Sequence, residues 1–460
     1  MSQTLISNEL NRIERMQSLQ LLRVVSIVTF LALSASPVQA TECEEGNPRH
    51  HTVAASASTV HWGYFSKNQE PVLEVRSGDF VTLEALTHHA GDDFDRMIKG
   101  DPGAESVYQW NPDGKNVERR GAGPMDASIH GRGAGEGFGV HIMTGPVRVC
   151  GAEPGDVLEV RILDVHLRPS GNPAFEGRTY GSNVAANWGF HYNDLIAPKE
   201  KREVVTIFEL DSSGGSVWAK PLYSYRWTPQ TDPFGVTHET IDYPGVVVNP
   251  ETVTKRPVLE GVQVRARPHF GTMGVAPREA DLVDTVPPAY FGGNIDNWRI
   301  GKGATMYYPV AVEGALFSVG DPHAAQGDSE LSGTAIETSL TGTFQLVLHK
   351  QSELKTTRLA DLHYPLLETE DAWIVHGFSY PNYLAELEEP QQSIYQNSSI
   401  DRAMRDAFRK MRHFLMTAEG LTEDEAISLM SVGADFGITQ VVDGNWGVHG
   451  TIKKEVFMPR

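Results

Sequence analysis

The chain has 460 residues, of which 40% are hydrophobic and 21% charged, and its net charge is −20 at pH 7. These proportions are those of an ordinary globular protein, long enough for one large domain or two of typical size. The strong negative charge argues against nucleic acid and anionic membrane surfaces as partners, because the long-range field would repel both. Small neutral or cationic ligands remain compatible with it.

The first 40 residues have the pattern of a secretory signal. Arg23 precedes the apolar run VVSIVTFLALSA, and the small residues of VQA end at Ala40. A positive flank, a short apolar core and small residues before the cleavage position are typical of such signals, and this run is too short to span a bilayer comfortably. We therefore expect cleavage after Ala40, a mature domain over residues 41–460 without a membrane segment, and a periplasmic or secreted protein.

The chain has two cysteines, Cys43 and Cys150. An exported protein with two thiols can carry one disulfide, although Cys43 lies close to the expected new N-terminus. The sequence leaves the pairing open.

Short strands separated by Gly and Pro turns dominate residues 55–350. PVLEVRSGDFVTLEAL alternates apolar and polar residues on both sides of RSGD, which predicts a hairpin, and REVVTIFELDSSGGSVWAK predicts another. Further strands are predicted in GAEPGDVLEVRILDVHLRP, PVLEGVQVRARP, TMYYPVAVEGALFSVGD and GTAIETSLTGTFQLVLHK. Residues 91–139 have almost no apolar period, so we expect an inserted loop or flap there.

Helices are predicted near the C-terminus, over residues 399–433. IDRAMRDAFRKMRHFLM has apolar residues at helical spacing, and TEDE offers a capping box for a second helix. FGITQVVDGNWGVHGTIKKEVF then returns to a strand pattern. The expected class is mainly β, with stacked β-sheets in a sandwich-like arrangement and a small α portion near the C-terminus.

Histidines recur where predicted strands begin or end. His88 and His89 follow the strand FVTLEAL, and His269 lies in RPHFGTMG. A strand end can hold a side chain rigidly at a cleft, but a single histidine there is more often a hydrogen-bonded structural residue. The motifs GxSxG and HExxH are absent, and DSSGGS is explained by a hairpin turn.

The stretch FSVGDPHAAQGDSELSG carries the densest group of ionisable residues: Asp321, His323, Asp328 and Glu330. We expect Asp321 to emerge as a buried strand ends, and Asp328 and Glu330 to share one side if the chain is extended. Carboxylates with an imidazole suit Zn²⁺ or another divalent cation, and without a metal they can act as general acids or bases. A polar surface turn is the alternative reading.

Several long motifs in order resemble the acetamidase/formamidase family: GPVRVCGAEPGDVLEVRILD, RPHFGTMGVAP, YFGGNIDNW and LFSVGDPHAAQGDSELSGTAIE. The resemblance spans roughly residues 60–350, with a further match near the C-terminus. It implies a mainly-β, homo-oligomeric hydrolase that cleaves short amides into ammonia and a carboxylate, with zinc or calcium at the site. Pro322 and Ser329 depart from the family pattern.

The resemblance assigns residues to roles. The family motifs GGNxD and GTMG place Asn294, Asp296, Gly271 and Gly274 at the site. The expected catalytic residues are Asp328, Glu330 and Asp296, the expected substrate-binding residues are Asn294, Gly271, Gly274 and His269, and the expected metal ligands are Asp321 and His323 with His88 or His89. An exported small-molecule binding protein on the same scaffold, without catalysis, is the alternative function.

Overall fold

The computed structural model describes residues 43, 46–111, 117, 122, 138–192, 202–211, 215–241 and 245–458. The predicted signal, much of the predicted flap at 91–139 and the centre of the DSSGGS turn lie outside these residues. Neither Cys43 nor Cys150 is a free thiol, and both are in disulfide form. Within the described part of the chain, no helix is long and apolar enough to cross a membrane.

The first large sheet has nine strands, and all its pairings are antiparallel except that of its first two strands. In spatial order they are β1 (His50–Val53), β5 (Phe80–Ala85), β20 (Leu340–His349), β7 (Val157–Leu167), β17 (Thr305–Pro309), β21 (Leu366–Glu368), β22 (Ala372–Phe378), β24 (Gly447–Lys453) and β23 (Ala434–Gln440). Strands far apart in the sequence are therefore neighbours.

The second large sheet has eleven strands. Its main path is β13 (Val264–Arg265), β10 (Trp218–Arg226), β9 (Val204–Asp211), β8 (Thr179–Ala185), β19 (Ile336–Glu337), β18 (Phe317–Ala325), β14 (His269–Gly274) and β16 (Gly292–Asn294). β6 (Ile142–Val149) joins it through β18 and also pairs with β2 (Val60–Trp62) and β4 (Leu73–Val75). Two short ribbons pair β3 (Tyr64–Phe65) with β15 (Val283–Asp284) and β11 (Gln230–Thr231) with β12 (Thr237–His238).

The main core lies between the two large sheets, which confirms the predicted stacked-sheet class. β20 buries every second residue from Leu340 to Leu346, as its alternating sequence predicts. From this strand the ring of Phe344 contacts Phe270 and Phe317 of the second sheet, with centroids 5.4 Å and 5.9 Å away. The sandwich therefore holds together through apolar side chains from both inner faces.

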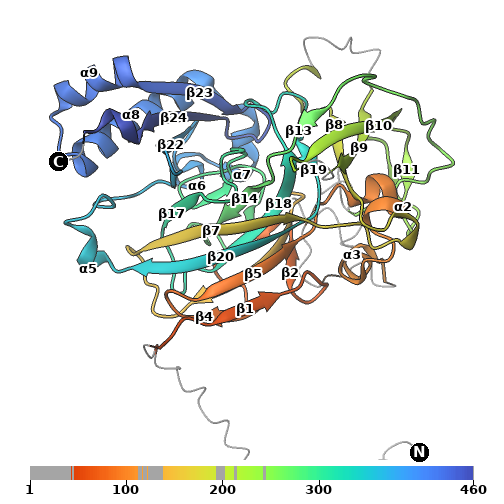
Figure 1. Ribbon diagram of the computed structural model, residues 1–460, viewed down its shortest axis with the longest axis horizontal. Coiled ribbons are helices and arrows are strands. Elements are labelled where there is room, and N and C mark those ends of the chain that lie inside the picture. Colours follow the sequence, from red (N-terminus) through yellow and green to blue (C-terminus); the bar gives the residue numbers. More distant parts are fainter. Residues whose placement is uncertain are drawn as a thin grey trace, which may run out of the picture. The chain divides into compact units, whose positions relative to one another are not determined.

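Two helices cover part of the nine-stranded sheet, α8 (Ile400–Ala418) and α9 (Glu423–Gly433), and Figure 1 shows them beside β22, β23 and β24. Met411, Phe414 and Leu415 of α8 pack into an apolar cluster with that sheet. The predicted capping box at Thr422 and Glu425 is present. These helices follow the local pattern of the sequence.

A buried ion pair ties α8 to β22. Lys410 Nζ lies 2.6 Å from Asp406 Oδ2 and donates a hydrogen bond to the carbonyl of His376, while Asp406 accepts one from the Phe378 amide. Lys410 and Asp406 are 4% and 5% exposed, so each charge is stabilised by its partner rather than by water.

The remaining helices of the described residues are short. They are η1 (Ala90–Asp93), α2 (Phe94–Met97), α3 (Pro102–Tyr108), η2 (Pro173–Phe175), α5 (Gln351–Leu354), α6 (Tyr383–Glu386), α7 (Pro390–Ser393), η4 (Ile394–Gln396) and η5 (Lys454–Val456). The first three lie in the segment predicted as a loop, so its beginning is helical instead. Asp93 and Asp101 cap α2 and α3 with side-chain oxygens, which gives these turns local support without an apolar period.

Two predictions about strands are wrong. The residues around RSGD do not form a hairpin, because β4 and β5 belong to different sheets. Asp79 accepts hydrogen bonds from the amides of Arg49 and Arg76, which fixes the corner between them. The strand that contains Asp321 does not end there, since β18 continues to Ala325.

Candidate active site

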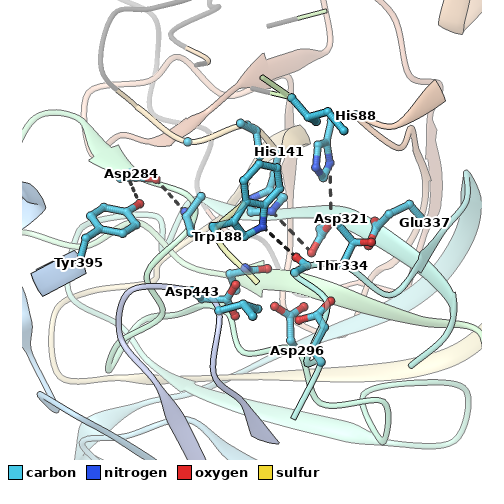
Figure 2. A pocket seen from close by; sticks show the side chains of 18 of the residues that line it. His88, His141, Trp188, Asp284, Asp296, Asp321, Thr334, Glu337, Tyr395 and Asp443 are labelled. Carbon is cyan, nitrogen blue, oxygen red and sulfur yellow. Dashed lines mark hydrogen bonds and ion pairs between the residues drawn. The ribbon is translucent and has the colours of Figure 1, made fainter. Parts of the chain in front are cut away.

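A cavity of about 460 Å³ lies beside the central strands of the eleven-stranded sheet, and ionisable side chains crowd one part of it. Those among its lining are His88, His141, Asp296, Asp321, Glu330, Glu337 and Asp443. They come from segments distributed over most of the described chain. Figure 2 shows His88 and His141 both directed at Asp321.

Three neighbouring strands position a row of ionisable side chains, of which Asp321 and Glu337 line the cavity. In the pairing of β14, β18 and β19, His323 lies opposite both His269 and Glu337. His323 Nε2 lies 3.1 Å from Glu337 Oε1 and 3.1 Å from Asp321 Oδ2, and its Nδ1 lies 3.1 Å from His269 Nε2. The sheet register therefore sets the spacing of the row.

Burial and neighbouring charged groups determine which histidine of this row is protonated. Burial alone would lower the pKa of His323, but Glu337 and Asp321 raise it well above its ordinary value. Burial and the nearby His323 lower the pKa of His269 to about 3, so His269 is neutral. Its Nδ1 hydrogen-bonds with the carbonyl of Arg267 at 2.7 Å. His323 thus carries the positive charge between two carboxylates.

The imidazoles of His88 and His141 both lie close to the carboxylate of Asp321. His88 Nδ1 lies 3.8 Å from its Oδ1, and His141 Nε2 lies 3.7 Å from its Oδ2. Burial alone would raise the pKa of Asp321, but His323 and His141 hold it well below its usual range. The structure therefore keeps an ionised carboxylate in a buried setting.

A second group, of three carboxyl side chains, lies next to the row: Asp296, Glu330 and Asp443. Burial and the proximity of Asp296 raise the pKa of Glu330 well above its usual range. Burial, Asp296 and Glu330 do the same for Asp443. Like charges in so small a space favour retained protons unless a cation lies among them.

Strained backbone concentrates at these residues. Asp296, Asp321, Ser329 and Glu330 all have positive φ, at 52°, 49°, 84° and 47°. Non-glycine residues adopt this region at an energetic cost, and such residues cluster at functional sites. Ser329 is held in place by hydrogen bonds with Thr439 and Val441 of the C-terminal segment. The bend at Ser329 and Glu330 turns Glu330 into the cavity.

Gly271 fits closely beneath the carboxylates. A Cβ added there would lie 2.3 Å from Asp296 Oδ1, 2.3 Å from Asp321 Oδ2 and 2.6 Å from His323 Cε1. No side chain other than hydrogen leaves those groups where they are. Asn294, also predicted, lines the cavity and accepts a 2.5 Å hydrogen bond from Thr272 Oγ1.

The structure brings most of the predicted residues together. Asp321, His323, Asp296, Glu330 and His88 gather within the ionisable groups described above. His89 lies next to His88 and Glu337, and its Nδ1 is 3.1 Å from Asp92 Oδ2.

Two predicted residues lie elsewhere. The side chain of Asp328 is 41% exposed and pairs with Arg299, because the positive φ of Ser329 and Glu330 breaks the extended geometry that would have placed both acids on one side. Burial alone would raise the pKa of Asp328, but Arg299 lowers it. Gly274 packs against the backbone of Phe291 and Gly293 rather than against the acids.

Three residues of the site were not predicted: His141, Glu337 and Asp443. Glu337 stands in the predicted strand GTAIETSLTG, where an acid within an apolar run was the available signal. His141 and Asp443 have no local signal, since only the tertiary fold brings GVHIM and VVDGN to the cavity.

The donors present fit a divalent cation. Several sets of three ligand atoms lie within 4.8 Å of one another, among them His88, His141 and Asp321, and Asp296, Glu330 and Asp443. Among the described atoms, one buried oxygen on each of Asp296, Glu330, Glu337 and Asp443 has no hydrogen-bond partner. Buried oxygens of this kind are costly without a partner, and a cation would supply one.

Known structures share the fold. An acetamidase from Yersinia enterocolitica superimposes with a TM-score of 0.57 at 20% identity, over 90% of this chain and 94% of that one. An acetamidase from Bacillus halodurans gives a TM-score of 0.56 at 20% identity, over 88% of this chain and 98% of that one.

Sequence comparison extends the likeness. An acetamidase from Mycolicibacterium smegmatis is 31% identical over 214 residues, which are 42% of this chain and 49% of the relative. A formamidase from Methylophilus methylotrophus is 29% identical over 213 residues, 42% of this chain and 47% of the relative. The chain thus matches about half the length of these curated relatives. The model of the acetamidase/formamidase family covers residues 138–285 and 278–457, which hold all but one of the ionisable cavity residues, and the chain belongs to this family.

Proposed function

We propose that the protein hydrolyses carboxamides to a carboxylate and ammonia. The observation that carries the proposal is the buried row of Glu337, His323 and Asp321 beside the acids Asp296, Glu330 and Asp443, at one part of a cavity that admits a small molecule. Relatives that bear the names acetamidase and formamidase support the same reaction class.

We propose that a divalent cation, zinc or calcium, belongs to the site. Asp321 with His88 and His141 would hold a zinc ion, whereas the all-oxygen set of Asp296, Glu330 and Asp443 suits calcium better. Such an ion would polarise the amide carbonyl and make a water molecule more acidic.

The chain's own residues supply proton transfer. Amide nitrogen leaves readily only once it is protonated, so a group that still holds a proton near neutral pH is needed. When the cation is held by Asp321, His88 and His141, Glu330 meets this requirement, because burial and Asp296 raise the pKa of its carboxyl well above its usual range. His323, paired with Asp321 and Glu337, fixes the position of both carboxylates. Asp328, which was also predicted to be catalytic, pairs with Arg299 instead.

We propose further that the mature protein begins after Ala40, acts in the periplasm or outside the cell, and forms a homo-oligomer. The signal-like composition of residues 1–40 supports export. The resemblance to the family supports the oligomer.

The test is ammonia release from formamide and acetamide by the purified mature protein, with its metal content measured and with zinc or calcium added back after chelation. Asp321→Asn and His323→Ala should each reduce the rate by orders of magnitude, while Asp401→Asn, on the exposed face of α8, should not. If the first two variants fold normally and keep the parent rate, the assignment of Asp321 and His323 to the reaction is wrong. Binding of amides without turnover under every metal condition would instead favour the non-catalytic binding protein.

A further inference from the structure

The cavity has a second, apolar part beyond the ionisable residues. Trp188, Ile241, Val286 and Val442 line it, together with Phe138 and Val140. In Figure 2, Asp284 and Tyr395 stand on one side of the view and His88 and Glu337 on the other, with Trp188 between them. The cavity therefore extends well past the groups assigned to the reaction.

Three polar side chains in this part already hydrogen-bond within the protein. Asp284 Oδ2 accepts a 2.7 Å hydrogen bond from the Tyr395 hydroxyl, and its Oδ1 accepts one of 2.8 Å from the Val286 amide. Trp188 Nε1 donates to the carbonyl of Gly333 at 3.1 Å, which fixes the indole. A ligand here would meet mainly apolar surface.

The size of the cavity exceeds what formamide or acetamide would fill. Its volume is about 460 Å³, within the range of about 300–1,000 Å³ that is typical of pockets for much larger ligands. Acetamide offers only a methyl, a carbonyl and an amino group, so it would leave the apolar walls in contact with water. A ring-sized apolar substituent would cover them and release that water.

The charge of the lining restricts the ligand further. Among the described lining residues six are Asp or Glu and none is Lys or Arg; the acids are Asp284, Asp296, Asp321, Glu330, Glu337 and Asp443. Among these described residues, a carboxylate on the ligand would therefore find no cationic side chain to pair with.

We infer that the substrate, given the proposed function, is an uncharged carboxamide that carries a ring-sized apolar group, with the amide at the ionisable part and the ring against Trp188, Ile241 and Val286. In hydrophobic enzyme pockets a single methylene changes kcat/KM by about tenfold or more. A phenyl group should therefore raise kcat/KM at least about tenfold over acetamide.

The experiment compares acetamide, phenylacetamide, N-benzylacetamide and para-carboxylated phenylacetamide, with kcat/KM from ammonia or amine release and Kd from calorimetry on the metal-loaded protein. The two benzyl compounds distinguish a ring on the acyl side from a ring on nitrogen, and a tenfold advantage for either supports the inference. The carboxylated compound should be at least about tenfold poorer than phenylacetamide. Equal or better use of acetamide, or equal use of the carboxylated compound, would overturn it.

Two variants probe the assigned location. Val286→Phe should lower kcat/KM for the preferred benzyl amide at least about tenfold more than for acetamide, whereas Val286→Ala should shift the preference toward bulkier rings. Val432→Phe, at a position 83% exposed on α9, is the matched control and should leave the ratio unchanged. An unchanged ratio in both Val286 variants refutes the location. If no amide is hydrolysed but the benzyl compounds still bind at least tenfold more tightly, the proposed function fails while the ligand class stands.

Discussion

Gly271 offers the sharpest test of the arrangement of acids, through the substitution Gly271→Ala. Ordinary contact for a Cβ begins near 3.4 Å, but here Asp296 Oδ1 and Asp321 Oδ2 would lie 2.3 Å away, so each oxygen must move by 3.4 − 2.3 = 1.1 Å. Both oxygens belong to groups that we assign to the reaction. A misplacement of about 1 Å can reduce a rate by about 10²-fold, and overpacking of a core costs about 1–3 kcal/mol of stability.

We therefore expect the Gly271→Ala protein to fold with a modestly lower melting temperature, to bind less metal and to lose about 10²-fold in kcat/KM. Bound metal is measured by elemental analysis after dialysis, and activity by ammonia release with excess metal present. Gly327→Ala is the matched control, since nothing lies within 4 Å of an added Cβ at Gly327. If both variants retain the parent metal content and rate, the reasoning about Asp296 and Asp321 is refuted.

Two further predictions concern proton transfer and the buried ion pair. Glu330→Gln should reduce kcat/KM by about 10²–10⁴-fold, because Glu330 lines the cavity. Asp328→Asn should have little effect, because Asp328 lies outside the cavity and pairs with Arg299. Since the active Glu330 is protonated and its pKa is raised, the parent rate should fall as pH rises through that pKa, a limb that the Gln variant should lack. Lys410→Met should lower the free energy of unfolding by about 3–5 kcal/mol in urea titration, because it leaves Asp406 buried and unpaired. The variant with both Asp406→Asn and Lys410→Met should regain part of that loss, and equal losses would contradict the pairing.

The parts of the fold that the sequence predicts are those with local causes. The register of apolar residues in α8, the capping box at Thr422 and the alternation of β20 each depend on neighbours a few positions away. The separation of β4 from β5 into different sheets does not, because it depends on which distant strands each one pairs with. The same alternating pattern fits a hairpin and a corner equally well.

The residues of the site also separate into those with a local signal in the sequence and those without one. Asp321 and His323 are recognisable because two ionisable residues follow a buried apolar run within one motif. Asp443 and His141 are not, since their relation to Asp321 exists only after folding. Asp328 and Glu330 show a third case, in which the residue types are right but two positive φ angles decide which acid enters the cavity. Spacing alone does not reveal a bend of that kind.

The wide separation of the contributing segments has a consequence for when the protein becomes active. The cavity acids and imidazoles extend from His88 to Asp443, a distance of 443 − 88 = 355 positions. The bend that directs Glu330 inward is also held by Thr439, at the end of β23. A chain synthesised or refolded only as far as β22 would contain most strands of both sheets, yet it would lack Asp443 and the anchor for Glu330. Activity should therefore emerge as one of the last events of folding, and its recovery would report completion of the native chain more strictly than recovery of β-sheet content.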